Sequence, residues 1–386
     1  MAAAKIVTIS GTRLLYKGDD PADSIELVGL VEVGNCIVAQ KGLYQVGDKA
    51  LFIEPDYCLP DTPMFQEYIR PGGDERKCRL GRNGRIRAIK FNLHTGDGQP
   101  VYSYGILIPF VDITIDELMR QSDMDKYLGI KKYEEPEPFQ GHKGKVVSIP
   151  FPEQMYKTDE LNINNVINQM EFPIRLIGLW KIDGSSCSIW CKNGKSGIAS
   201  RNQGKPLTYK KVVGYKKPNL FFKFLMFFGY KYDGKVIKSV ESDDQFVVYG
   251  KPYLAKLIEY CELYDIDLVL RGELRGKSCK GSGNPNNPHA KVENDIEFFG
   301  IDDYTHSAVK LPYSEVKKIA SGLGIKLVHE YFNEEFKDKD HLLSTCQTLF
   351  SYHEKFNGKV IEGVVVRNEE GTFSAKIMNL SYDSKK

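Results

Sequence analysis

The run Lys181-Ile182-Asp183-Gly184 places an amine, a carboxylate and a flexible backbone position together at the end of an apolar segment. A lysine acts as a covalent nucleophile when desolvation or nearby cations lower its pKa. The preceding residues LIGLW predict apolar walls around Lys181, and Gly184 would let the backbone approach a phosphate closely. A surface lysine in an Asp-Gly turn fits the same pattern, so this run alone leaves both interpretations open.

Four charged residues follow on segments that are otherwise strand-like. Arg201 in SRN offers a planar guanidinium for a ribose or phosphate oxygen, and Lys376 in SAKIMN offers a second cation. Glu273 in LRGELRG and Glu362 in VIEGVVVR are carboxylates among Val, Leu and Ile. Carboxylates buried in such surroundings usually have a polar or charged partner. Arg201 and Lys376 also fit a solvated surface.

Two adjacent phenylalanines, Phe298 and Phe299 in IEFFGID, offer an aromatic ring on a further predicted strand. Such a ring is suited to stack on a purine, although a core position is the simpler interpretation of either residue alone. Neighbours on a strand face opposite ways, so only one of the two rings can face a ligand. We take Phe298 as the candidate.

Residues 5–115 read as short strands separated by turns. Gly-Asp at 47–48 and Asn-Gly at 83–84 supply turn chemistry between segments rich in β-branched and aromatic residues. Five or six strands in about 110 residues predict a small closed barrel, and an OB-fold is the leading expectation. An Ig-like sandwich is the alternative, because a strand count does not separate the two.

The remainder of the chain mixes strands with helical segments, which is an α+β pattern. The predicted strands are RLIGLWKI, CSIWC, LVLRGEL, IEFFGID and KVIEGVVVR, and the helices include PYLAKLIEYCELY and PYSEVKKIASGLG. Between the two regions, IDELMRQSDMDKYLG looks helical, and the charged, Pro-bearing stretch after it reads as a linker. We therefore expect an OB-fold domain over 1–130, a linker over 131–149 and a second domain over 150–386.

Two segments have compositions that stand out. Residues 76–90 contain seven Lys or Arg and no acid around an Asn-Gly turn, which fits either a phosphate-contacting hairpin or a solvated charged edge. Residues 220–232, LFFKFLMFFGYKY, are apolar and aromatic, and we expect a buried helix there rather than a partner-facing patch. The Lys-rich run YKKVVGYKK just before it is a further candidate for contact with a nucleic-acid strand.

The bulk composition sets limits on the class of protein. The 386 residues carry 53 basic and 51 acidic side chains, a net charge of +2, so binding of nucleic acid would need a local basic surface. No run of about 18 apolar residues exists, so neither a membrane span nor a membrane partner is expected. Eight cysteines without a CxxC pair predict free thiols in a reducing compartment.

The order of these motifs resembles the covalent nucleotidyltransferase superfamily of ATP-dependent DNA and RNA ligases and mRNA capping enzymes. KIDGSS is similar to motif I, SRN to motif Ia, RGEL to motif III, IEFFGID to motif IIIa, IEGVVVR to motif IV and AKIMN to motif V. The resemblance covers 150–381. With a barrel expected ahead of the lysine, the whole chain resembles the RNA ligases typified by the Deinococcus and Naegleria enzymes.

This resemblance implies a fold and an activity. The fold is α+β, an N-terminal OB-fold barrel followed by an adenylyltransferase domain of antiparallel sheets, the ATP-grasp-like ligase type. The activity is ATP-dependent RNA ligation, as in RNA repair, of 3′-OH and 5′-phosphate ends at nicks in duplex, through lysyl–AMP and an adenylated RNA end. Lys181 is then the catalytic residue, and the nucleotide-binding set is Lys181, Asp183, Gly184, Arg201, Glu273, Phe298, Glu362 and Lys376. Asp183, Glu273 and Glu362 would hold Mg²⁺ or Mn²⁺ through water.

Two positions depart from the family pattern. Trp180 stands where ligases often carry a Glu that reaches the adenine, and Met378 stands where motif V often has a second lysine. The alternatives are therefore a DNA ligase, a capping-type enzyme, or an OB-fold binding protein with a degenerate catalytic domain. The expected partners are ATP and RNA or an RNA-containing nicked duplex, with the protein a monomer in the cytoplasm or nucleus.

Overall fold

The computed structural model of the chain separates into two compact units. Unit 1 holds residues 1–136 and 161–172, and unit 2 holds 137–160 and 173–386. The structure describes residues 2–74, 78, 80–98, 100–110, 115–134, 149–153, 155–279, 281–351 and 359–382. Residues 161–172, which the sequence analysis assigned to the second domain, thus group with unit 1, whereas most of the expected linker lies outside the described residues.

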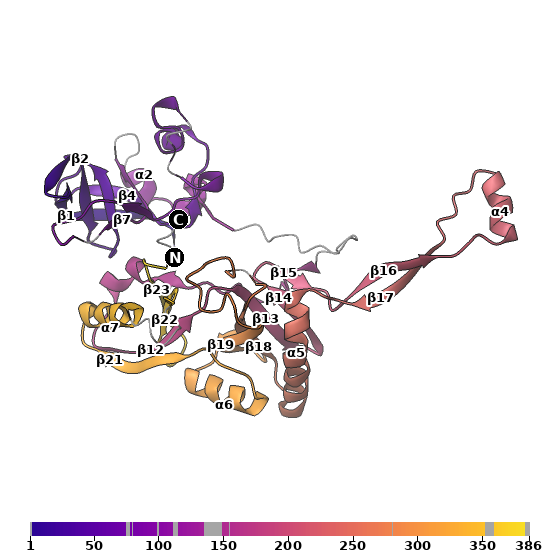
Figure 1. The fold of residues 1–386 in the computed structure, drawn as a ribbon. Coiled ribbons are helices and arrows are strands. Elements are labelled where there is room, and N and C mark those ends of the chain that lie inside the picture. Colours follow the sequence, from indigo (N-terminus) through magenta and orange to yellow (C-terminus); the bar gives the residue numbers. More distant parts are fainter. Residues whose placement is uncertain are drawn as a thin grey trace. The chain divides into compact units, whose positions relative to one another are not determined.

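Unit 1 is built on a five-stranded sheet of order β3-β2-β1-β4-β8 (Figure 1). Strand β1 (Ala4–Lys17) belongs to both halves of this sheet. Its first five residues pair antiparallel with β4 (Lys49–Ile53), and its later part pairs with β2 (Asp20–Leu30) through two register shifts. A long first strand shared in this way lets the sheet curl toward a barrel.

Backbone and side-chain hydrogen bonds also link the region before β8 (Ile106–Pro109) to β3 (Cys36–Gln40), the opposite end of the strand order. The Tyr104 amide donates to the Cys36 carbonyl at 3.0 Å, and the Val38 amide donates to Ser103 Oγ at 3.0 Å. A sheet whose end strands approach each other is compatible with a barrel, and the OB-fold stays a prediction.

The sequence-predicted strands of this region are present, and the helical segment IDELMRQSDMDKYLG forms α2 and α3. The other elements of unit 1 are short: β5 (Tyr57–Cys58), β6 (Ile89–Phe91), β7 (Val101–Ser103), β9 (Lys131–Lys132), β11 (Leu161–Asn162), α1 (Gln66–Ile69), α2 (Ile115–Met119), α3 (Met124–Leu128), and the 3₁₀ turns η1 (Pro63–Phe65), η2 (Pro71–Gly73), η4 (Arg82–Gly84), η5 (Ile163–Asn165) and η6 (Ile167–Gln169).

Part of the basic segment 76–90 lies outside the described residues. In the described part, the Gly81 amide donates to the Arg85 carbonyl around the Asn-Gly turn, where Asn83 and Gly84 have φ of 58° and 73°. Arg85 pairs with Asp56 at 2.5 Å and lies over the Tyr133 ring at 4.2 Å. Strand β6 at the end of this segment pairs with β7, and contact of the segment with phosphates stays a prediction.

Unit 2 contains two antiparallel sheets with helices, which confirms the α+β class. The larger sheet has seven strands of order β10-β15-β14-β13-β18-β19-β20, and a second sheet contains the run β23-β22-β12-β21. The strands are β10 (Ile149–Pro150), β12 (Ile174–Lys181), β13 (Ser185–Lys192), β14 (Lys195–Ser200), β15 (Gln203–Lys205), β18 (Leu268–Arg275), β19 (Asp295–Asp303), β20 (Val309–Lys310), β21 (Glu330–Phe336), β22 (Gly363–Arg367) and β23 (Ser374–Met378).

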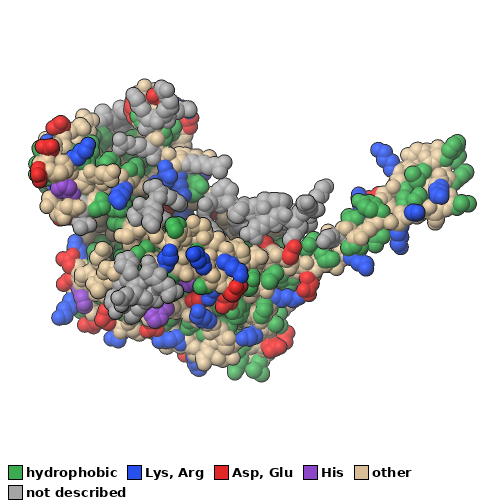
Figure 2. Space-filling view, in the orientation of Figure 1, with side chains coloured by type: hydrophobic (Ala, Val, Ile, Leu, Met, Phe, Trp, Pro, Cys, Tyr) green, Lys and Arg blue, Asp and Glu red, His purple; other side chains and the backbone are tan. Residues whose placement is uncertain are grey.

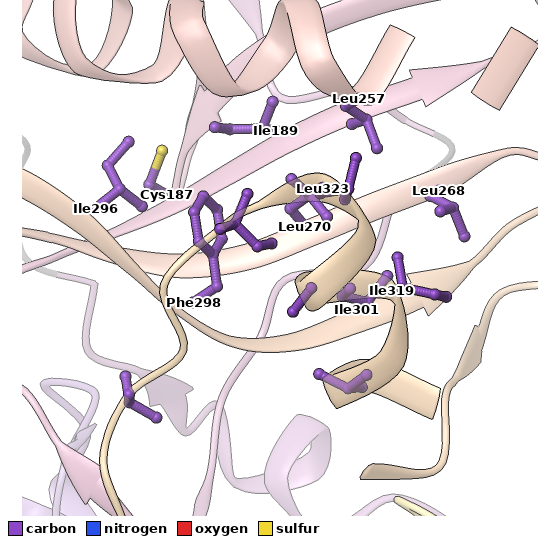
Figure 3. Packing of buried hydrophobic residues seen from close by; sticks show 14 of the residues in the cluster. Cys187, Ile189, Leu257, Leu268, Leu270, Ile296, Phe298, Ile301, Ile319 and Leu323 are labelled. Atoms are coloured by element: carbon purple, nitrogen blue, oxygen red, sulfur yellow. The ribbon is translucent and has the colours of Figure 1, made fainter. Parts of the chain in front are cut away.

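The main core of unit 2 lies between the larger sheet and two helices, α5 (Gln245–Tyr264) and α6 (Tyr313–Leu323). Alternate residues of β13 and β18, such as Ile189 and Leu270, point into this core, as Figure 3 shows. The Leu257 side chain on α5 and the Leu323 side chain on α6 pack against them. The remaining long helix, α7 (Lys339–Ser351), was not among the sequence-predicted helices. All eight cysteines are free thiols, as predicted.

The apolar segment 220–232 does form a helix, α4 (Leu220–Phe227), but the expectation that it is buried is wrong. Strands β16 (Thr208–Tyr215) and β17 (Lys235–Glu241) form a separate two-stranded sheet that carries α4 at its end (Figure 1). No residue of α4 is buried, and Leu220 and Phe227 are 87% and 85% exposed. Within the described parts of the chain, none of the helices is both long and apolar enough to span a membrane.

Candidate active site

Lys181 is the last residue of β12, a strand that lies between β21 and β22. In the antiparallel ladder Lys181 is opposite Gly363, which places it beside Glu362. The Lys181 Nζ donates to Glu362 Oε2 at 2.6 Å, and the two side chains are 24% and 17% exposed. Two of the sequence-predicted residues, 181 positions apart in the chain, therefore form a partly buried ion pair.

The electrostatic surroundings of Lys181 differ from those expected from the sequence. Burial lowers the pKa of the amine, but the adjacent Glu362 carboxylate, followed by Glu273 and Asp183, outweighs it, so that the pKa is raised above its usual 10.5. The apolar walls predicted from LIGLW are present, because Leu179 and Ile182 are buried. Their effect is overcome by three carboxylates, so the prediction of a lowered pKa is wrong for the protein without bound nucleotide or metal.

Asp183 is held by two residues from distant parts of the chain. The Tyr382 hydroxyl donates to Asp183 Oδ2 at 2.8 Å, and the Asn287 side-chain amide donates to the Asp183 backbone carbonyl at 3.0 Å. Tyr382 is 4% exposed, so its hydroxyl is a fixed partner. The carboxylate after the lysine is thus oriented by the fold, and neither partner was identified from the sequence.

Gly184 lies where the backbone and the Glu273 side chain come close together. A Cβ at this position would lie 2.5 Å from the Leu274 carbonyl oxygen and 2.9 Å from Glu273 Cγ. Glu273 on β18 is opposite Ser186, the second residue of β13. Gly184 therefore allows the chain between β12 and β13 to pack directly against Glu273. A larger residue at this position would prevent that close packing.

Phe298 does not have the position expected of a ring that stacks on a base. It is fully buried among the core residues between the larger sheet and α5 (Figure 3). Its ring is edge-on to that of Tyr253, with 5.1 Å between the ring centres. The ladder between β18 and β19 shifts register here, because Gly272 is opposite Phe298 and Arg271 is opposite Gly300. The extra residue is Phe299, which is only partly buried. Phe299 also packs against this core, so burial of Phe298 argues against stacking by that ring without placing Phe299 in the site, and the base-stacking residue stays a prediction.

The two predicted cations occupy other strands of unit 2. Arg201 follows β14 and lies 3.7 Å from Asp159, with 39% of its side chain exposed. Lys376 is half-buried on β23, opposite Val365 of β22. Because β22 also pairs with β12, Lys376 belongs to the same sheet as Lys181.

The three carboxylates proposed as metal ligands share the neighbourhood of Lys181, since each raises the pKa of its amine. In the described residues, no three His, Cys, Asp or Glu side chains are close enough together to coordinate a metal directly. A hydrated divalent cation, which contacts carboxylates through its water shell, fits this arrangement of oxygen donors better than a directly coordinated one.

Sequence reasoning missed a cluster next to the catalytic candidates. The Trp180 ring packs against His289 at 4.8 Å. Burial is the main cause that lowers the pKa of His289 to about 4. The Glu297 carboxylate opposes this shift, whereas the Arg275 and Lys326 cations add to it. Glu297 is itself buried and accepts from Arg275 at 2.8 Å and Lys326 at 2.7 Å. The motifs RGEL and IEFFGID pointed to this region, because Arg275 directly follows the first and Glu297 is the glutamate of the second.

A second missed network lies on the face of the larger sheet opposite the main core. Arg271, the arginine of RGEL, is 2% exposed and donates to Asp302 at 2.6 Å, Ser188 at 2.9 Å and Tyr304 at 3.1 Å. Its guanidinium also lies 4.8 Å from the Tyr156 ring centre. This network fixes three adjacent strands, β13, β18 and β19.

Comparison with known proteins identifies the family of the chain. The family model described as RNA ligase matches residues 176–378, more than half of the chain, from β12 with its lysine to β23 with Lys376. The chain therefore belongs to the RNA ligase family and is an enzyme of that family. A search of curated protein sequences gave no significant match.

Solved structures of Naegleria gruberi RNA ligase resemble the chain over its full length. The ligase solved with PPi is 21% identical, with a TM-score of 0.69, and the match covers 100% of this chain and 98% of that one. A mutant solved with ATP and Mn is 20% identical with a TM-score of 0.70, covering 99% and 97%. A mutant solved with AMP and Mn has 21% identity and a TM-score of 0.69, covering 100% and 98%. At this identity the similarity concerns the fold.

Proposed function

We propose that this protein is an ATP-dependent RNA ligase that seals 3′-OH and 5′-phosphate ends, at nicks in duplex, through lysyl–AMP and an adenylated RNA end. The observation that carries the proposal is Lys181 at the end of β12, ion-paired with Glu362 and close to Glu273 and Asp183. The Naegleria ligase structures were solved with ATP, with PPi and with AMP. In such a reaction ATP is the substrate of the adenylylation step, PPi leaves in that step, and AMP is the group that is transferred.

In the first step, the Lys181 amine gives up one proton to water and the neutral Nζ attacks the α-phosphorus of ATP. The N–P bond forms, the bond to the bridging oxygen breaks, pyrophosphate leaves, and Nζ loses a second proton to water. Glu362 and Asp183 hold the amine and its surroundings in place before the reaction. Phosphoryl transfer of this kind depends mainly on positioning and on neutralisation of phosphate charge.

A hydrated Mg²⁺ or Mn²⁺ is implied, and the oxygen donors near Lys181 fit it. Asp183, Glu273 and Glu362 would contact its water shell, and the ion would neutralise phosphate charge. The same three carboxylates stabilise the protonated amine in the metal-free protein. Lys376 would contribute a cation to the nucleotide, and one ring of the Phe298–Phe299 pair would contact the base.

In the second step, an oxygen of the 5′-phosphate attacks the lysyl–AMP phosphorus, the P–N bond breaks, and the amine regains its protons. In the third, the 3′-OH attacks the 5′-phosphorus and AMP leaves as the phosphodiester closes. We propose that Arg201 contacts the nucleotide sugar or the 5′-phosphate. The OB-like sheet of unit 1 and the basic segment 76–90 would bind the RNA backbone, chiefly through electrostatic attraction.

The decisive experiment is the intact mass of the protein after incubation with ATP and either Mg²⁺ or Mn²⁺. The parent should gain the mass of one AMP, and Lys181→Ala should gain none. Lys195→Ala, an exposed lysine on β14, is the matched control and should be adenylated like the parent. Absence of the adduct in a folded parent protein with both metals would overturn the proposal.

Two comparisons separate the remaining members of the superfamily. ATP, GTP and NAD⁺ as labelled donors distinguish a ligase that uses ATP from a capping-type enzyme. Nicked duplexes with ribose or deoxyribose at the 3′-OH side distinguish sealing of RNA from sealing of DNA. Tight binding of nucleic acid without any adduct would indicate a binding protein with a degenerate catalytic domain.

A further inference from the structure

The segment Thr208–Glu241, here called the arm, is a hairpin that stands apart from the two sheets of unit 2. Strands β16 and β17 pair only with each other in the described structure, over seven residue pairs interrupted by one register shift. Figure 1 shows the arm extending from β15 and α5, with α4 at its far end. An isolated two-stranded hairpin is marginally stable in water, so a partner surface would stabilise the arm.

The tip of the arm is a defined helix with an apolar surface. Asn219 caps α4 by accepting from the Phe222 amide at 3.0 Å, and Phe222 packs against Tyr232 at 5.0 Å. Six of the eight residues of α4 nevertheless remain exposed large apolar side chains: Leu220, Phe221, Phe222, Phe224, Met226 and Phe227. Figure 2 shows them gathered at the end of the arm. A helix that is apolar on all sides is normally covered by protein or lipid.

The charge of the arm is as uneven as its hydropathy. It contains eight lysines and two acidic residues, whereas the whole chain is close to neutral. Both acidic residues are already paired, Asp233 with Lys235 at 2.8 Å and Glu241 with Lys251 at 2.5 Å. Lys216, Lys217 and Lys223 on and next to the helix are exposed. The surface that complements the arm is therefore anionic and also accepts apolar side chains.

We infer that the arm is a peripheral membrane anchor that inserts the tip of α4 into an anionic phospholipid bilayer. Lysines would contact lipid phosphates and carboxylates while the Phe, Leu and Met side chains enter the acyl region, as in interfacial helices. Tyrosines on the arm, such as Tyr215 and Tyr230, suit the headgroup level. The absence of an apolar span in the sequence predicted no membrane partner, but a peripheral contact needs no span.

Two other occupants fit the arm less well. RNA would satisfy the lysines, and its bases can stack on exposed rings, but it offers no apolar environment for the aliphatic side chains of Leu220 and Met226. A second copy of the chain would cover the apolar tip, but it would bring two arms of the same strong positive charge together. The inference is independent of the proposed ligase activity, because no arm residue belongs to the site around Lys181.

The test is flotation of the full-length protein with two kinds of vesicle, phosphatidylcholine alone and phosphatidylcholine mixed with phosphatidylserine. The parent should float with the anionic vesicles only, and added salt should weaken this binding. The tip variant Phe221→Ser/Phe224→Ser/Phe227→Ser should bind at least about tenfold less well, since burial of one Phe corresponds to more than a decade in partition. Leu263→Ser/Tyr264→Ser, exposed apolar residues at the end of α5, is the matched control and should bind like the parent.

Insertion is measured separately with Phe224→Trp. Its fluorescence should be quenched by lipids brominated on the acyl chain, whereas the parent, which has Trp180 and Trp190 only, should change little. Equal flotation of parent and tip variant would overturn the inference. The inference would also be overturned if the parent bound no vesicles and the tip variant lost binding to RNA. A third contrary result is a dimer of the parent protein that the tip substitutions abolish. Lysyl–AMP formation should be the same in all these variants, so failure of the anchor leaves the ligase proposal intact.

Discussion

The Lys181 amine and the Glu362 carboxylate are joined at 2.6 Å, across neighbouring antiparallel strands, although 181 residues separate them in the chain. Glu362 precedes β22 and lies beside the end of β12 because Lys181 and Gly363 are opposite each other in the ladder. The pair keeps the amine in position but also keeps it protonated, since Glu362 is the main cause that raises its pKa against the effect of burial. Adenylylation therefore has to overcome an interaction that the fold itself provides.

Replacement of Glu362 by Gln should separate these two effects. The rate of lysyl–AMP formation should rise with pH in the parent, because only the neutral amine attacks and the raised pKa places that form at high pH. In Glu362→Gln the rising limb of this profile should move to lower pH, while the maximal rate falls by roughly 10²-fold as positioning is lost. Rapid-quench measurement of the adduct across pH checks both; a variant profile that coincides with the parent's would contradict this role of Glu362.

Gly184→Ala should impair the same step through geometry alone. The added Cβ would be 2.5 Å from the Leu274 carbonyl oxygen, which is backbone, and 2.9 Å from Glu273 Cγ. Either the turn after Lys181 or the Glu273 side chain has to move, and a displacement of this size costs about 10²-fold in a reaction that depends on positioning. Gly283→Ala, where a Cβ would meet nothing within 4 Å, is the matched control and should retain the parent rate of adduct formation.

Tyr382→Phe should show how much the orientation of Asp183 contributes. The variant removes the hydroxyl that donates to Asp183 Oδ2 at 2.8 Å and keeps the buried ring. Adduct formation should fall about tenfold with a small change in stability, on the scale of one lost hydrogen bond to a charged group. Tyr313→Phe, a buried tyrosine on α6, controls for the general effect of the substitution. If both variants lose activity equally, the hydroxyl has no specific role.

The sequence predicted the strands of the site well, because each is a short apolar run ending at a polar motif. RLIGLWKI, LVLRGEL and IEFFGID correspond to β12, β18 and β19. Side-chain direction was less predictable. A register shift between β18 and β19 places Phe298 in the core and makes Phe299 the extra residue, and strict alternation cannot locate such a shift. Tyr382 was missed because its contact with Asp183 spans 199 residues.

The prediction that residues 220–232 are buried was wrong for a different reason. An apolar, aromatic run of this composition predicts burial, because burial of such side chains is the main driving force of folding. The structure instead places the run at the end of a hairpin whose strands pair with no other strand of the described chain. Whether a helix packs against a core depends on where its flanking strands pair. The amino-acid composition of the helix gives no information about that pairing.

The buried Arg271–Asp302 pair should contribute strongly to stability. The side chains are 2% and 3% exposed and 2.6 Å apart, and Arg271 also donates to Ser188 and Tyr304. Asp302→Asn would leave a buried guanidinium without its counter-charge, which should lower the free energy of unfolding by about 3 kcal/mol. Glu315→Gln, at the exposed Lys318–Glu315 pair of α6, should change it by less than about 0.5 kcal/mol. Urea unfolding of the parent, Asp302→Asn and Glu315→Gln proteins measures these differences. Equal unfolding midpoints for all three would refute the prediction.

His289 should make the stability of the enzyme depend on pH in a defined window. It is 8% exposed, its Nδ1 has no hydrogen-bond partner among the described residues, and burial is the main cause that lowers its pKa to about 4. An unfolded histidine titrates near pH 6.5. Below that pH the unfolded chain binds a proton that the folded protein does not, so stability should be greatest above about 6.5 and fall as the pH drops toward 4.

This loss should reach about 2 kcal/mol between pH 7 and pH 5, and His289→Phe should remove it. Other groups titrate in the same range, so the informative quantity is the difference in unfolding free energy between parent and variant at each pH. His306→Gln, an exposed histidine after β19, is the matched control and should follow the parent. A His289→Phe protein whose stability declines with acidification as steeply as the parent's would show that folding does not lower the pKa of His289, because a group with the same pKa in both states adds nothing to the pH dependence.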